Sequence, residues 1–154
     1  MRWGVHFVSE GDFGIDKMLG NPKLVISEDV LVKMEDGILI EKNAHDIEKT
    51  DTIIDLGANA VELARPLIAA AKLILWNGPL GKYEDGGAEA TKAILRLIAG
   101  ATKNGTISII GGGDTAAVIS ELKIENEFTF VSTGGGAALD FLASGTLPGI
   151  KVLE

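Results

Sequence analysis

The sequence contains no cysteine and no long apolar segment. The absence of cysteine excludes disulfides, thiolate metal sites and a cysteine nucleophile. No stretch approaches the roughly 20 consecutive apolar residues that a membrane helix requires. Residues 1–20 show no basic start followed by an apolar run, so the pattern of a secretory signal peptide is missing as well. A soluble, cytoplasmic protein is the expectation.

Positive charge is also scarce, with 14 Lys and Arg residues against 22 Asp and Glu and a net charge of −8. Nucleic acid and anionic membranes both require broad positive potential, so neither is an expected partner. Local backbone amides can still hold a single phosphate group. Hydrophobic residues make up 46% of the chain, so a folded core is expected. The length of 154 residues is enough for one sizeable core but too short for two ordinary domains.

Several catalytic motifs are missing. Gly81-Lys82 is followed by Tyr83, so the chain has no P-loop. No His-x-x-x-His pair for zinc and no G-x-S-x-G elbow occur. Gly111-x-Gly113-x-x-Ala116 fits a loose dinucleotide fingerprint, but it lies outside the first strand–helix unit and lacks the downstream acidic residue. His6 and His45 stand in polar or irregular stretches and are interpreted as surface residues.

Glycine is abundant instead, with 20 residues that gather in clusters. Residues 1–22 show no period and stay unassigned, and residues 23–154 are predicted to form one α/β domain. Short strand-like runs occur at Leu24–Ile26, Val30–Val32 and Ile38–Ile40, the last after a turn at Asp36-Gly37. Four strand–helix units follow, with strands at Thr52–Leu56, Leu73–Trp76, Ile107–Ile110 and Phe128–Val131.

Helical spacing marks the second half of each unit. Val61, Ala64, Ile68 and Ala71 share one face, although Pro66 predicts a kink or a late start near Arg65. The later helices are expected around Ala90–Ile98, Asp114–Leu122 and Ala137–Ala143. Apolar strands that alternate with amphipathic helices predict a three-layer, Rossmann-like domain with a mostly parallel sheet. Ligands in such sheets bind at the carboxyl ends of the strands.

The third unit ends its strand in Gly111-Gly112-Gly113 and begins a helix at Asp114. The first amides of a helix have no intrahelical partner and lie at the positive end of its dipole. A phosphate can therefore lie against them, and Asp114 would serve if a Mg²⁺ ion stood between it and the phosphates. The alternative is that Asp114 and Thr115 only cap the helix.

The fourth unit repeats this arrangement with Gly134-Gly135-Gly136. Two adjacent helix starts can point at one highly charged group, which suits a phosphoryl group in transfer. Close packing of helix against strand would also demand glycine, and that reading stays open.

The segment from Trp76 to Gly87 is the third candidate loop. Gly78-Pro79 and Gly81 indicate a specific, rigid turn. Asn77 either orients a ligand or caps its own loop. Glu84 either bonds ribose hydroxyls, as acidic residues do in other nucleotide sites, or is a solvated surface residue.

Five segments, in this order and at these intervals, resemble the carboxy-terminal half of phosphoglycerate kinase. They are DLG (Asp55–Gly57), LWNGPLGKYE (Leu75–Glu84), IIGGGDTAA (Ile109–Ala117), VSTGGGAALDFL (Val131–Leu142) and LPGI (Leu147–Ile150). The resemblance is specific from Thr52 onward, weak for Lys23–Val32 and absent for Met1–Pro22.

That resemblance implies phosphoryl transfer from 1,3-bisphosphoglycerate to MgADP. It implies a metal site at Asp114 and places Glu84 on the ribose. The nucleotide site it implies comprises Gly57, Asn77, Pro79, Gly81, Glu84, Gly112, Gly113, Asp114 and Thr115. The groups it places around the transferring phosphoryl are Gly113, Gly134, Gly135 and Gly136.

The sequence also departs from the family. It has no counterpart of the amino-terminal lobe, of a GGAKVSDK-like loop or of the later GGGM loop. Lys82 stands where the family usually has an apolar residue, and Ala138 stands where it often has serine. The domain is therefore expected to be incomplete, with an exposed sheet edge that favours a complementary lobe or self-association. Alternatives are a non-catalytic nucleotide-binding module and a structural relic.

Overall fold

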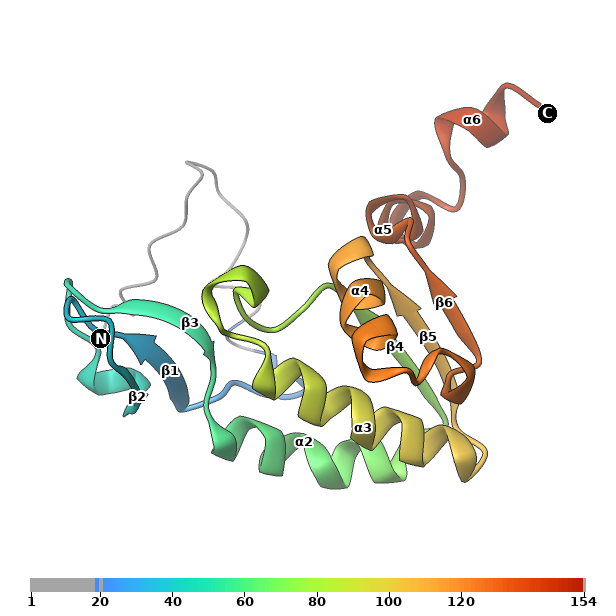
Figure 1. The fold of residues 1–154 in the computed structure, drawn as a ribbon. Coiled ribbons are helices and arrows are strands. Elements are labelled where there is room, and N and C mark those ends of the chain that lie inside the picture. The colour runs from blue at the N-terminus through green and yellow to red at the C-terminus, as the bar shows by residue number, and fades with distance from the viewer. Residues whose placement is uncertain (1–18, 20, 154) are drawn as a thin grey trace.

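The computed structural model describes Leu19 and residues 21–153, so most of the unassigned segment 1–22 and His6 lie outside the described residues. Figure 1 shows a small sheet at one end of the molecule and a second sheet toward the other, with two long helices running alongside. The strands are β1 (Asp29–Lys33), β2 (Leu39–Asn43), β3 (Thr52–Leu56), β4 (Leu73–Asn77), β5 (Ile107–Gly111) and β6 (Phe130–Ser132). The α-helices are α2 (Ala58–Ala70), α3 (Glu89–Lys103), α4 (Gly113–Leu122), α5 (Gly135–Ser144) and α6 (Pro148–Lys151), and the 3₁₀ turns are η1 (Ala44–Asp46), η2 (Tyr83–Asp85) and η3 (Glu125–Glu127).

The first sheet is antiparallel, in the order β2-β1-β3. Its hairpin turns at Asp36-Gly37 as expected, with Gly37 at a φ of 83°. Two expectations for this region were wrong. Leu24–Ile26 forms no strand, and β3 pairs antiparallel with β1 instead of joining the parallel sheet. The hairpin places β1 beside β3, and a short apolar run does not specify which sheet it will join.

The second sheet is parallel, in the order β4-β5-β6, and its helices confirm an α/β, Rossmann-like domain. Ile110 of β5 is fully buried on the inner face with Leu95 and Ile98 of α3 and Val118 and Ile119 of α4. Ile68 of α2 and Trp76 of β4 pack against this core. Strands that alternate side chains between two faces thus bury one face under helices.

The opposite face of the parallel sheet keeps its apolar side chains exposed. Residues that pair across the sheet share a face, which places Leu73, Leu75, Ile107 and Phe130 together. Each of the four is between 46% and 59% exposed. Exposed apolar faces are typical of surfaces that other segments or chains cover.

Helix α2 begins at Ala58 and continues to Ala70 with Pro66 inside it, so the late start near Arg65 was wrong. Proline at this position removes one hydrogen bond to the preceding turn. Helix α2 packs along α3, and that packing outweighs the local penalty.

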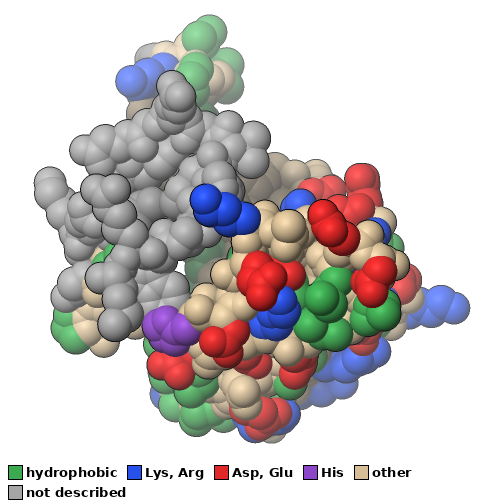
Figure 2. Space-filling view, turned by 90° about the vertical axis from the view of Figure 1, so that its left-hand side faces the viewer, with side chains coloured by type: hydrophobic (Ala, Val, Ile, Leu, Met, Phe, Trp, Pro, Cys, Tyr) green, Lys and Arg blue, Asp and Glu red, His purple; other side chains and the backbone are tan. Residues whose placement is uncertain are grey.

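Charged side chains are scattered over the end of the molecule formed by the antiparallel sheet. Figure 2 shows mainly acidic groups there, with basic groups interspersed among them. Among the side chains drawn in colour, no broad basic surface appears. No helix in the described part of the chain is long and apolar enough to cross a membrane.

Candidate functional site

Three strand ends of the parallel sheet meet at one edge. Asn77 of β4 pairs with Gly111 of β5, and Gly111 pairs with Ser132 of β6. The pairing continues past the strands, because the amide of Gly78 donates to the carbonyl of Gly111 at 3.1 Å and that of Gly112 to Ser132 at 3.0 Å. The carboxyl ends of parallel strands are where α/β sheets bind ligands, and all three candidate loops leave from here.

The two triple-glycine loops pack directly on each other. A β-carbon on Gly135 would lie 2.8 Å from both the amide nitrogen and the Cα of Gly112, and it would overlap the side-chain oxygen of Asn77. Gly112 itself has a φ of 105°, which favours glycine. Close packing therefore does require glycine here, which was the alternative explanation for the triple-glycine loops. It also brings the starts of α4 and α5 together.

Helix α4 opens with three amides that have no acceptor among the described residues. Its first intrahelical bond runs from the amide of Ala116 to the carbonyl of Gly112, so the amides of Gly113, Asp114 and Thr115 remain available. Gly113 and Asp114 are exposed, and a β-carbon on Gly113 would face open space. The side chain of Thr115 is instead fully buried, and its hydroxyl finds no partner among the described residues.

Helix α5 opens in the same way. The amide of Ala138 donates to the carbonyl of Gly134, and the amides of Gly135, Gly136 and Ala137 have no acceptor among the described residues. The amide of Gly134 is already used, because it donates to the hydroxyl of Ser132 at 3.1 Å. Sequence reasoning missed Ala137, although its place in the first turn of a helix after three glycines was a usable signal.

The start of helix α2 is closed by carboxylates. The amides of Asn59 and Ala60 donate to the two carboxylate oxygens of Asp29 at 2.8 and 3.1 Å, and the amide of Ala58 donates to Glu41 at 3.1 Å. A β-carbon on Gly57 would collide with the Asp29 carboxylate. The Asp29 carboxylate therefore occupies the start of α2, and its proximity explains why residue 57 is a glycine.

The start of helix α3 is closed by Asp55. This carboxylate is 2% exposed and accepts the amides of Ala90 at 3.1 Å and Leu56 at 2.9 Å. Burial raises the pKa of Asp55 above its ordinary value, with a smaller contribution from the nearby Glu89 charge, while the amide donors oppose the shift. A β-carbon on Gly81 would lie 2.5 Å from Asp55, which explains that glycine.

The loop from Asn77 to Ala88 is fixed at several points. The amide of Lys82 donates to the carbonyl of Ile54 at 2.6 Å, and the amide of Leu80 donates to the hydroxyl of Thr91 at 2.9 Å. Pro79 is half-buried, whereas Glu84 is exposed on η2. Within the described residues, no hydrogen bond or ion pair engages the Glu84 carboxylate.

The predicted metal residue is Asp114, which is exposed in the first turn of α4. The described residues contain no group of three or more His, Cys, Asp or Glu side chains that could hold a metal ion. Mg²⁺ is commonly held by one or two carboxylates together with substrate phosphates, and Asp114 beside three available amides fits that pattern.

Two cavities lie away from the glycine loops. One, of about 350 Å³, is at the carboxyl ends of α2 and α3 and is lined by Arg65, Lys72 and Arg96 among others. The other, of about 310 Å³, is lined by apolar side chains of α2, α3 and β4. Neither cavity is lined by Gly113 or Gly136, and both of these glycines are exposed at the helix starts.

Comparisons with known proteins agree with this geometry. Residues 15–145 match the family model described as Phosphoglycerate kinase. The chain is 41% identical over 138 residues to a phosphoglycerate kinase of Chlorobium phaeobacteroides, covering 85% of this chain and 34% of that protein. It is 42% identical over 142 residues to a phosphoglycerate kinase of Dictyoglomus turgidum, covering 92% of this chain and 34% of that protein.

A solved structure gives the same picture. Phosphoglycerate kinase from Coxiella burnetii superposes with a TM-score of 0.75 at 35% identity, over 92% of this chain and 37% of that one. The chain thus spans about a third of the length of the relatives that it matches.

Proposed function

The chain belongs to the phosphoglycerate kinase family, and from that premise we propose that it is the ADP/ATP-binding part of a phosphotransferase. The reaction would move a phosphoryl group between 1,3-bisphosphoglycerate and MgADP. One observation carries the proposal. Of the four helix starts described above, α2 and α3 are closed by Asp29 and Asp55, while α4 and α5 are open side by side.

The chemistry needs little from the protein beyond positioning and charge stabilisation. An oxygen of the ADP β-phosphate forms a bond to phosphorus while the bond from phosphorus to the acyl oxygen breaks, and 3-phosphoglycerate leaves as a carboxylate. Negative charge spreads over the three equatorial phosphoryl oxygens. The amides of Gly113 and Asp114 and those of Gly135 and Gly136 would donate to these oxygens and to the nucleotide phosphates.

Asp114 would hold the magnesium ion that accompanies the nucleotide. Its exposure next to available amides supports this role, because the carboxylate can reach an ion that phosphate oxygens also bind. The ion, when bound, supplies positive charge to the phosphates.

The loop that follows β4 would hold the nucleoside. Asn77, Pro79, Gly81 and Glu84 lie on this loop, and we assign Glu84 to the ribose because its exposed carboxylate is not engaged by other described residues. Gly57 has the least support among the proposed nucleotide-binding residues, since the Asp29 carboxylate fills the adjacent helix start. Gly57 would act through close packing and not through its amide.

Turnover would require a complementary segment that binds the phosphoglycerate, whether on the same polypeptide or another. Two surfaces of the parallel sheet support this requirement. Strand β4 is an edge, with no strand beyond it among the described residues. The outer face carrying Leu73, Leu75, Ile107 and Phe130 is exposed. Self-association through the same edge is the alternative, and a cytoplasmic location accompanies the proposed glycolytic role.

A second candidate is a nucleotide-binding module without catalysis. It is favoured by the span of about a third of the relatives' length. A coupled kinase assay separates the two candidates when this chain is mixed with the separately purified amino-terminal part of the Chlorobium phaeobacteroides relative. Activity that needs both pieces supports the kinase proposal. Saturable MgADP binding without any activity in the mixture supports the module.

A further inference from the structure

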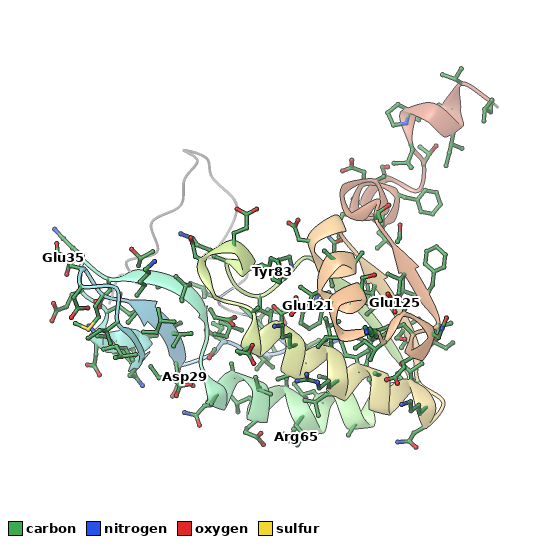
Figure 3. The ribbon with its side chains drawn as sticks, viewed as in Figure 1. Asp29, Glu35, Arg65, Tyr83, Glu121 and Glu125 are labelled. Carbon is green, nitrogen blue, oxygen red and sulfur yellow. The ribbon has the colours of Figure 1, made fainter. Side chains whose placement is uncertain are left out.

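Tyr83 connects the nucleotide loop to helix α4. Its hydroxyl donates to a carboxylate oxygen of Glu121 at 2.7 Å. The other carboxylate oxygen of Glu121 lies 3.0 Å from the ammonium of Lys92 on α3. Figure 3 shows Tyr83 and Glu121 together, between the loop and α4. Glu121 therefore joins three elements: η2, α3 and α4.

This contact is placed to control the site. Glu121 and Asp114 are two helical turns apart on α4, and positions seven residues apart lie on the same helical face, about 10 Å from each other along the axis. Tyr83 thus docks on the side of α4 that carries Asp114. Glu84 is the next residue after Tyr83 in the same 3₁₀ turn, η2.

Two other anchors hold the loop just before η2. Lys82 is held by the carbonyl of Ile54, and Leu80 by Thr91. Among the described residues, the Tyr83 phenol makes the only hydrogen bond between a side chain of η2 and helix α4. Without it, the short turn carrying Glu84 would keep its attachment to β3 but lose its attachment to α4.

We propose that Tyr83 is a positioning residue of the nucleotide site, which sets Glu84 relative to Asp114 through its bond to Glu121. This inference rests on the proposed function and assigns a partner to a side chain that the sequence motifs left without a role. The link also has a chemical signature of its own. The Glu121 carboxylate raises the pKa of the Tyr83 phenol, mainly through the hydrogen bond.

The link itself can be tested without any ligand. The chain contains one tyrosine, so tyrosinate absorbance during a pH titration reports Tyr83 alone. Replacement of Glu121 by Gln should lower the pKa of Tyr83 toward its ordinary value of about 10. The control is Glu125→Gln, which removes an acidic group that Ser120 contacts and that does not touch the loop. An unchanged titration in Glu121→Gln would overturn the link.

The positioning role is tested by calorimetric titration with MgADP and with magnesium pyrophosphate. Tyr83→Phe and Glu121→Gln should each lower the affinity for MgADP three- to tenfold, with no further loss in the double variant. The affinity of each variant for magnesium pyrophosphate should stay within twofold of wild type. A general loss of structure would instead lower the affinity for both ligands. Equal MgADP affinity in wild type and Tyr83→Phe would overturn the positioning role alone. A wild-type chain that does not bind MgADP would overturn the proposed function and this role with it.

Discussion

The side-chain oxygen of Asn77, at the end of β4, lies against the Cα of Gly135, at the start of α5. No β-carbon fits between them, and the same position on Gly135 also faces the backbone of Gly112. This contact joins all three candidate loops at one point. The open starts of α4 and α5 therefore depend on close packing at Gly135, in addition to the amide that this residue would offer to a phosphate.

Gly135→Ala should damage both the fold and the site. The added methyl group would overlap Asn77 and Gly112, and overpacking of this kind costs about 1–3 kcal/mol. MgADP affinity should fall at least tenfold because α5 must shift away from α4. The matched control is Gly100→Ala in α3, whose β-carbon meets open space and which should stabilise the helix by about 0.5 kcal/mol. Urea unfolding and calorimetry measure both effects, and equal behaviour of the two variants would contradict the packing argument.

Asp29→Ala should lower stability without removing the nucleotide site. The substitution leaves the amides of Asn59 and Ala60 without their acceptor, and loss of a helix cap costs about 1–2 kcal/mol. Because α2 starts away from the glycine loops, MgADP affinity of the folded variant should stay within about twofold. A tenfold loss of affinity at full folding would show that the start of α2 belongs to the site.

Asp55 should give the stability curve a specific pH dependence. Its pKa is raised in the folded chain by burial, so folding favours the protonated carboxyl. Its stabilising contribution is therefore fully present below the ordinary aspartate pKa of about 3.9 and is lost as the pH rises through the higher folded value. Wild type should lose stability relative to Asp55→Asn over that rise. Urea unfolding of both proteins from pH 4 to pH 7 measures the difference, and a relative gain for wild type would contradict the assignment.

The sheet edge should control self-association. Leu73 is 57% exposed on edge strand β4, and a lysine there would oppose pairing with another strand. If the isolated chain associates, Leu73→Lys should reduce that association in sedimentation experiments. Leu142→Lys, at a 60% exposed position on α5, is the control. A wild-type chain that stays monomeric at high concentration would argue against the edge as an interface.

The parallel sheet and its helices were predictable because apolar strands and helical spacing repeat in strict alternation from Leu73 onward. Pairing of β3 with β1 was not, because the register between distant strands depends on tertiary contacts and not on local pattern. The triple-glycine loops were correctly placed beside one another at the strand ends. The sequence could not show that Asp29 and Asp55 close two of the helix starts, since each carboxylate lies 30 or more positions from the helix-start amides that it accepts.

The most direct test of the central claim is calorimetric titration of the chain with MgADP, repeated with Asp114→Ala. The control is Asp140→Ala, which removes an exposed carboxylate from α5. The account predicts saturable binding by wild type and by the control, and an affinity at least tenfold lower for Asp114→Ala, equivalent to about 1.4 kcal/mol. A folded wild-type chain without saturable binding, or equal affinities for all three proteins, would contradict the claim that the open starts of α4 and α5 form a nucleotide site.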